Sequence, residues 1–483
     1  MAGSQMVAVA GEAGSAQGKR RATALFVVML AVAMDLVDAS AVNVALPSLR
    51  AGFHMSGSGL QWVVAGYSLS FAAMLLTGGR LGDVLGYRRT FLIGTAGFTT
   101  ASLACALAPA TAFLIAARVA QGTAAAFMVP QATSLLQLLY RPEERSRVMG
   151  LFGALAGLAA ASGPVVGGVI LKADLPGADW RPIFLLNVPV GAVALVAAAL
   201  LLPDGRSPEP TRLDIRGSCL VVAGLSLLTL PLIQGPDLHW PPWTVVCLAG
   251  SAPVLLFAVH DQRTRPGAAL VAKGLFSQRT FVSGLSLSLL VNAVMGGMVL
   301  STTYTLQEGL GLSAVRAALT TLPMIVGMVF GVGVLAEFLI PRLGRYVITL
   351  GSGILAAGVL ASAWILHRHG HSTQVWQLAP GLLVTGVGLG SLMGPLFAIT
   401  LQHATIAQTG SASGALESIQ QFGGALGVVF VGGVFLHRAD AGGSLGAFTW
   451  AAGSALLLLA VIAMGAQFVP RHFRNDKELT SGS

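Results

Sequence analysis

Long apolar runs separated by short polar links dominate the chain. A helix needs ~20 mostly apolar residues to cross a bilayer, and the runs are of about that length. Dividing the chain at its charged, proline-rich and glycine-rich links predicts fourteen membrane-spanning helices. These helices cover residues 22–46, 59–78, 90–108, 112–139, 147–171, 182–202, 215–234, 243–260, 281–304, 317–340, 346–366, 376–400, 411–436 and 446–468.

A weak internal repeat divides the predicted helices into two halves. The fourth and twelfth helices each contain a stretch that begins with glycine and ends in proline, Gly122 to Pro130 in one and Gly386 to Pro395 in the other. Transporters commonly arise by such duplication. We therefore predict two six-helix bundles with two inserted helices between them. The predicted regions are a disordered cytoplasmic N-tail (1–21), an N-terminal bundle (22–203), inserted helices with linkers (204–279), a C-terminal bundle (280–469) and a cytoplasmic C-tail (470–483).

Composition supports an all-α integral membrane protein. The chain has 54% hydrophobic and only 10% charged residues, whereas soluble domains have roughly 25% charged residues. Unpaired backbone amides are costly in lipid, so spanning segments are helices or closed barrels, and the long unbroken runs favour helices. The scarcity of lysine beside arginine indicates a GC-rich bacterial genome, which predicts a multi-pass protein of the bacterial inner membrane.

The net charge of +9 does not indicate a nucleic-acid partner, because nearly all of the charge lies in the links. If both termini are cytoplasmic, the inner links and tails contain 21 Lys and Arg residues and the outer links contain six. Such an excess is typical of cytoplasmic loops. We therefore predict cytoplasmic termini.

Three charged residues lie deep inside predicted helices of the first half, where charge is costly and usually marks a pathway or a proton relay. Asp35 and Asp38 share one face of the first helix, and Arg118 lies in the fourth at a depth similar to that of Asp38. A guanidinium that moves between two carboxylates would make their proton affinity depend on conformation. We predict proton coupling by these three residues. The alternative is a static Asp–Arg bridge that locks two helices together.

Other polar residues within the predicted helices are candidates for substrate binding. Glu337 and Glu417 are suited to a cationic substrate or a second proton, but both are also compatible with carboxylates that reach headgroup water. Asn292 occupies the position where the repeat places the counterpart of Asp35, and a helix–helix hydrogen bond is its alternative role. Gln121 is a further candidate for substrate binding.

Two motifs are predicted to act in gating. The link after the second helix combines turn glycines, an acid and arginines, which allows a charge-paired clasp or a plain cytoplasmic anchor; its residues are Gly79, Asp83, Gly86, Arg88 and Arg89. The fifth helix has small residues along one side and an internal proline, at Gly163, Pro164 and Gly167. Small residues allow close approach, and proline bends a helix. We interpret the second motif as a tight contact across the two halves, with ordinary packing as the alternative.

No nucleotide-binding fingerprint or catalytic constellation occurs in the sequence, so we predict a transporter that uses the proton gradient and needs no cofactor. Histidines 367, 369 and 371 fall in one outer link, where a solvated loop is favoured over a metal site. A polytopic membrane enzyme is a remote alternative, as is a non-transporting receptor. An enzyme would be expected to place catalytic or metal-binding groups at one depth.

These features resemble the major facilitator superfamily, and in particular its fourteen-spanner drug/proton antiporter family (EmrB/QacA type). The resemblance covers about residues 22–468 and rests on motifs in the family's order. They include residues 37–47 of the first helix, Leu60 to Val63 with Tyr67, the Gly79 to Arg89 loop, Leu114 to Ala126, the fifth helix, and Asp179 to Phe184 followed by Asn187-Val188-Pro189.

The resemblance implies alternating access by the rocking of two bundles, with Asp38 and Arg118 as the proton-handling pair. It implies a monomer in the lipid bilayer that exports lipophilic, cationic drugs or antibiotics in exchange for protons. A dedicated exporter of one endogenous metabolite or siderophore is the alternative. In the second half the loop motif has decayed, because Pro341 stands where an aspartate is expected.

Overall fold

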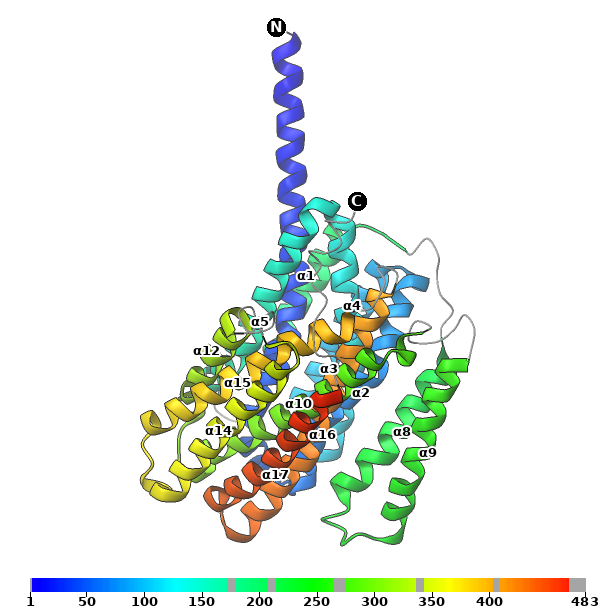
Figure 1. Cartoon of the computed structure of the whole chain (residues 1–483). Coiled ribbons are helices and arrows are strands. Elements are labelled where there is room, and N and C mark those ends of the chain that lie inside the picture. Colours follow the sequence, from blue (N-terminus) through cyan, green and yellow to red (C-terminus); the bar gives the residue numbers. More distant parts are fainter. Residues whose placement is uncertain are drawn as a thin grey trace.

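The described part of the chain is helical and contains no strand (Figure 1). The computed structural model describes residues 2–172, 179–206, 214–264, 274–335, 343–402 and 408–468. The predicted Glu337 therefore lies outside the described residues.

The helices follow the predicted order of two bundles and an inserted pair. The first bundle comprises α1 (Ala2–Phe53), α2 (Gly57–Leu85), α3 (Tyr87–Ala106), α4 (Thr111–Leu139), α5 (Pro142–Lys172), α6 (Arg181–Leu185) and α7 (Asn187–Leu201). The inserted helices are α8 (Ile215–Gln234) and α9 (Pro242–Thr264). The second bundle comprises α10 (Arg279–Tyr304), α11 (Ala314–Thr320), α12 (Leu322–Phe330), α14 (Tyr346–His369), α15 (Val375–Leu401), α16 (Thr409–Gly442) and α17 (Ser444–Gly465), with π-helical turns at Thr305–Gly309 and Gly331–Leu335.

Thirteen helical segments of the described residues are long and apolar enough to cross a membrane. The remaining predicted span corresponds to α3, which is 20 residues long and whose four threonines lower its hydropathy. Two spans are each divided into two helices, one into α6 and α7 and the other into α11 and α12. Pro189 and Pro323 follow these breaks, and proline cannot donate the backbone hydrogen bond that would continue the helix across them.

The N-terminal residues differ from the prediction of a disordered tail. Helix α1 begins at Ala2 and continues without interruption into the first span (Figure 1). The segment contains many alanines, which have the highest helix propensity, and a helix that is already nucleated extends at low cost.

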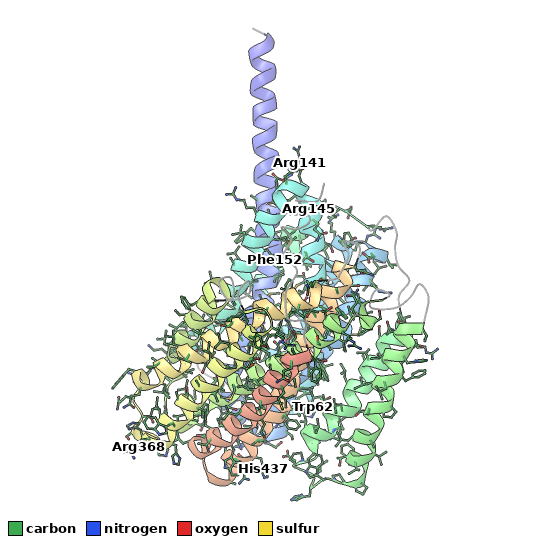
Figure 2. The ribbon with its side chains drawn as sticks, in the orientation of Figure 1. Trp62, Arg141, Arg145, Phe152, Arg368 and His437 are labelled. Carbon is green, nitrogen blue, oxygen red and sulfur yellow. The ribbon has the colours of Figure 1, made fainter. Side chains whose placement is uncertain are left out.

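The two ends of the bundle contain most of its charged residues. Arg141 and Arg145 lie near one end, whereas Arg368 and His437 lie near the other (Figure 2). We call these the Arg141 end and the Arg368 end. The apolar core runs between them.

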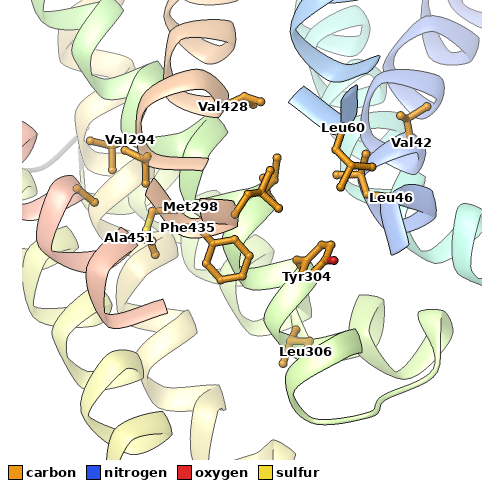
Figure 3. Close-up of a cluster of buried hydrophobic side chains, with 14 of the residues drawn as sticks. Val42, Leu46, Leu60, Val294, Met298, Tyr304, Leu306, Val428, Phe435 and Ala451 are labelled. Carbon is orange, nitrogen blue, oxygen red and sulfur yellow. The ribbon is translucent and has the colours of Figure 1, made fainter. Parts of the chain in front are cut away.

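The two halves pack together mainly through α2 and α16. A Cβ at Gly57 would lie 3.5 Å from Leu436, and one at Gly414 would lie 3.2 Å from Leu76, so the contact extends along most of α2. Near the Arg368 end, buried apolar residues of both halves form one continuous cluster, which includes Leu46, Leu60 and Phe435 (Figure 3).

The inserted helix α8 covers the seam between α2 and α16. Leu225 of α8 packs with Ala72 of α2 and Phe422 of α16. Ser218 also forms a 2.6 Å hydrogen bond with Thr77 of α2. Helix α9 packs on α8 and lies on the outer side of this pair (Figure 1).

Candidate functional site

Asp38 of α1 and Arg118 of α4 form an ion pair in the interior of the first bundle. Arg118 Nη1 donates to Asp38 Oδ2 at 2.6 Å, and the two residues are each 1% exposed. The structure thus brings together two residues that are 80 positions apart in the chain. A charge pair buried to this degree is costly to desolvate and is maintained only with further hydrogen bonds.

Uncharged side chains supply these bonds to Asp38. Its Oδ1 accepts from Asn187 Nδ2 at 2.6 Å and from Gln121 Nε2 at 3.1 Å. Ser102 Oγ lies behind both amides and accepts from Gln121 at 2.8 Å and from Asn187 at 3.3 Å. Four helices, α1, α3, α4 and α7, therefore meet at one carboxylate.

Arg118 is held on all sides as well. Its Nε donates to the Val63 carbonyl of α2 at 3.1 Å, and its Nη1 also donates to Gln121 Oε1 at 2.6 Å. The guanidinium carbon lies 4.4 Å from the centre of the Tyr67 ring and 5.8 Å from that of Phe184. Such stacking is favourable for a desolvated cation.

Tyr67 connects the ion pair to the second predicted acid. Its hydroxyl donates to Asp35, while its ring lies against Arg118. Asp35 and Tyr67 are 5% and 3% exposed. A displacement of Arg118 would therefore disturb the hydrogen bond that Asp35 accepts, which couples the two carboxylates through one side chain.

Sequence reasoning did not identify Ser102, Tyr67 and Asn187 as site residues. Tyr67 and Asn187 occur only within family motifs, and Ser102 has no motif. A neutral polar side chain costs much less free energy in a membrane span than a charged one does, so its presence in the sequence is weaker evidence of a functional role. A signal was available for Asn187, because it precedes a helix-breaking Pro189 at a span that is otherwise apolar.

The candidates for substrate binding do not share one location. Gln121 is fully buried within the ion-pair network. Asn292 donates to the Ser288 carbonyl of its own helix at 2.8 Å. Glu417 of α16 is half-buried and makes no hydrogen bond within the described residues. It lies three residues after Gly414, whose Cβ would lie 3.2 Å from Leu76 of α2, so Glu417 is on the side of α16 that meets the first half.

The predicted loop clasp holds elements of the first half together. Arg88 Nη1 pairs with Asp204 at 3.0 Å, and the same guanidinium donates to the Ala199 carbonyl of α7. Gly86 has φ +100°, which a side chain would strain, and so permits the turn between α2 and α3. Asp83 accepts from the Tyr87 hydroxyl at 3.1 Å. The remaining two residues of the motif contribute less, since Arg89 is exposed and a Cβ at Gly79 would touch only Pro130.

The glycines of α5 correct one prediction. Gly163 and Gly167 pack on α1 of the same half, where Cβ atoms would lie 1.8 Å from Ser40 Oγ and 3.0 Å from the Ala41 Cβ. Only Gly168 reaches the other half, 2.9 Å from Val315 of α11. Residues 163 and 167 are one turn apart and share a face, whereas residue 168 is rotated by about 100°. Pro164 lies inside α5 beside this contact.

At the Arg368 end, polar contacts join the halves. Arg50 of α1 pairs with Asp440 of α16 at 2.5 Å and donates to the Tyr304 hydroxyl of α10 at 2.6 Å. Gln307, in the π-helical turn that follows α10, donates to the Val44 carbonyl at 3.0 Å. These contacts close the molecule on this side.

Replacing Asn187 with alanine is expected to lower transport about tenfold, because Asp38 loses its 2.6 Å donor and a buried acceptor left short of a partner costs ~1–3 kcal/mol. Transport rates in membrane vesicles, normalised to the amount of protein, would measure this. Thr100→Ala serves as the control, since Thr100 is exposed on α3 and bonds only its own helix. Equal rates for Asn187→Ala and the control would remove Asn187 from the site.

Several transporters and resistance proteins are similar to this chain over most of its length. It is 40% identical over 419 residues to a probable actinorhodin transporter of Streptomyces coelicolor, covering 86% of this chain and 72% of that protein. It is 34% identical over 452 residues to a methylenomycin A resistance protein of Bacillus subtilis, covering 92% and 91%. A puromycin resistance protein of Streptomyces alboniger is 32% identical over 446 residues, covering 90% and 88%.

Solved structures show the same fold. A bacterial homologue of the human lysosomal transporter Spinster, inward-facing and unoccupied, superposes with a TM-score of 0.62 at 15% identity, covering 93% of this chain and 96% of that one. A mutant of the peptide transporter POT gives a TM-score of 0.67 at 14% identity, covering 94% and 99%. Residues 28–428 match the family model of the Major Facilitator Superfamily. The chain therefore belongs to the major facilitator superfamily and is a membrane transporter rather than an enzyme.

Proposed function

We propose that this transporter exports lipophilic compounds, chiefly cationic drugs or antibiotics, in exchange for protons. The observation that supports proton coupling is the buried Asp38–Arg118 pair, which Tyr67 links to Asp35. The similarity to resistance and export proteins supports the direction and the class of cargo.

The contacts of Asp38 support proton exchange. A proton that binds to the Asp38 carboxylate cancels its attraction for Arg118, and the guanidinium is then free to move toward Asp35. Arg118 in this position stabilises the charge of Asp35, so binding at one acid promotes release at the other. Each proton that enters supplies ~1.4 kcal/mol per pH unit, which sustains about a tenfold gradient of cargo.

The packing of the halves supports alternating access. Contacts of Arg50 with Asp440 and Tyr304 close the Arg368 end. Toward the Arg141 end, the halves meet through apolar contacts, with Gly414 of α16 beside Leu76 of α2. Halves that are tied by an ion pair at one end and meet through apolar packing at the other correspond to one of the two states between which such a transporter rocks.

Orientation and location are part of the proposal. The Arg141 end is the cytoplasmic end, because the excess of arginine and lysine lies in the links on that side and at the two tails. The protein then resides in the bacterial inner membrane with both termini inside. Under this assignment the ion pair that ties the halves lies at the outer end, so we assign the structure to an inward-facing state, and we propose that the protein functions as a monomer.

Glu417 and Asp35 form the binding site for a positive charge on the cargo. Their carboxylates come from α16 and α1 and act on each other across the two halves. A cation between them would relieve this repulsion. Glu417→Gln is expected to reduce export of cationic compounds about tenfold, ~1.4 kcal/mol, and to leave neutral compounds unchanged.

Export of a matched cationic and neutral pair of antibiotics from cells would measure the effect of Glu417→Gln. Glu144→Gln provides the control, since this carboxylate is exposed at the Arg141 end. An equal effect on both members of the antibiotic pair would show that Glu417 does not select charge.

A dedicated exporter of a compound that the cell itself makes is the second candidate. The relative described as a probable actinorhodin transporter favours it. A resistance profile over structurally unrelated compounds distinguishes the two, because a multidrug exporter protects against many and a dedicated one against a single class.

Proton flux in sealed inverted vesicles tests the central proposal. After an acid interior has been established, addition of an exported antibiotic is expected to release protons at a rate that saturates with its concentration. Vesicles without the transporter give the background. Uptake of antibiotic that is indifferent to the pH gradient would refute proton coupling while leaving transport intact.

A further inference from the structure

A narrow pocket inside the second half is the counterpart of the ion-pair site in the first. The residues of the first site come from the first, third, fourth and sixth helices of their bundle, with a carbonyl from the second. The pocket is lined by the same helices of the second bundle. Its corresponding residues are Met295 of α10, Met324 of α12, Ser362 of α14, Leu382 and Thr385 of α15, and Phe448 of α17.

The two sites differ in chemistry. Where helices of the first half carry Asp38, Arg118 and Asn187, the equivalent helices of the second half carry Met295, Leu382 and Phe448. The pocket lining has no charged residue. The space in the second half that is equivalent to the Asp38–Arg118 site is therefore apolar.

Two of the three hydroxyls that line the pocket already donate hydrogen bonds within their own helices, and the third belongs to Thr302 at the partly exposed edge. Ser362 donates to the Gly358 carbonyl at 3.0 Å, and Thr385 donates to the Gly381 carbonyl at 2.8 Å. Each of these two hydroxyls donates its single hydrogen to a backbone carbonyl of its own helix, so neither can donate a hydrogen bond to a ligand. An occupant that needs hydrogen bonds or charge neutralisation would be poorly served here.

Three methionines favour an aromatic occupant. Met295, Met298 and Met324 line the pocket beside the Phe448 ring, and methionine sulfur makes favourable contacts with aromatic rings. The free space is about 20 Å³, so a ring enters only when methionine side chains turn aside. Methionine is unbranched and flexible, which makes this rearrangement inexpensive.

The pocket has an accessible side. Met295, Val299 and Thr302 follow one face of α10 and are partly exposed, whereas Leu289 and Ala293 on another face are packed tightly on α16. The same exposed stripe borders Asn292, the position that the repeat pairs with Asp35. A ligand would reach the pocket from this face.

We propose that this pocket binds an uncharged aromatic part of the exported compound, while the charge of the compound stays near Asp35 and Glu417. The proposal rests on the proposed export function and assigns a different role to each half of the protein. The first half handles the proton, and the second half selects for apolar aromatic surface.

A substitution that places an aromatic side chain permanently in the pocket tests the proposal. With ethidium as a fluorescent aromatic cation, Val299→Phe is expected to raise the half-saturating concentration for export at least about tenfold. The maximal rate and its pH dependence should remain those of wild type, because Val299 is remote from the ion pair in the chain's first half. Val326→Phe is the matched control, since Val326 is 61% exposed on α12.

A second measurement does not require the protein to fold with the larger phenylalanine side chain at position 299. In Met295→Cys, ethidium is expected to slow labelling of the new thiol by N-ethylmaleimide at least about threefold, assessed on the peptide that contains residue 295, because this position is on the partly exposed side of the pocket. Unchanged labelling, or an unchanged half-saturating concentration in folded Val299→Phe, would overturn the pocket assignment. Failure of wild type to export ethidium or any antibiotic would instead refute the proposed function.

Discussion

Asp38→Asn is expected to lower proton-driven export at least about 100-fold, with binding of the cargo retained. The carboxylate accepts hydrogen bonds from Arg118, Gln121 and Asn187. An asparagine has only one acceptor oxygen, so its amide group would face a donor, and Arg118 would lose its counter-charge. Breaking a buried pair in this way costs ~3–5 kcal/mol. Proton release in inverted vesicles and exchange of preloaded cargo, measured side by side, would separate coupling from binding.

The same experiment decides between a relay and a static bridge. A relay predicts that Asp38→Asn still exchanges cargo across the membrane while proton release stops. A structural bridge predicts instead that exchange and thermal stability fall together, and that Arg118→Ala behaves identically. Normal coupling in both variants would place the proton site elsewhere, for example at Asp35 with Glu417.

Gly163→Leu is expected to abolish folding or to leave an inactive transporter. A Cβ at this position would lie 1.8 Å from Ser40 Oγ and 2.9 Å from the Val37 carbonyl, so α5 would have to move away from α1. Overpacking of this kind costs ~1–3 kcal/mol or more. The displaced residues Val37 and Ser40 are within two positions of Asp38, so export should fall even where folding survives. Yield of folded protein and melting temperature in detergent would report the loss.

Gly150→Leu is the matched control on the same helix. A Cβ at Gly150 meets nothing within 4 Å, so the melting temperature should stay within a degree or two of the wild-type value. If Gly163→Leu were as stable as Gly150→Leu, the close approach of α1 and α5 would be incorrect. Reduced export by a stable Gly150→Leu variant would indicate that this region closes in the opposite state of the cycle.

Local patterns of apolar and charged residues predicted most of the fold. Each long apolar run between charged links can be recognised as a membrane span from its own residues, because lipid excludes unpaired backbone groups and charged side chains. The span that became α3 is predicted from its links although its threonines lower its hydropathy. Family motifs in the right order then indicate the superfamily, which the match over residues 28–428 confirms.

The sequence by itself thus determined the membrane class, the order of the helices and the acids and arginine within them, since each of these depends on the cost of placing one segment or one charge in lipid. Only the tertiary structure decided which neutral side chains complete the site. Asn187, Ser102 and Tyr67 gain their roles from helices that converge on Asp38 and Asp35. The partners of the α5 glycines were likewise set by packing, because the face of a helix that meets a given neighbour depends on where that neighbour lies.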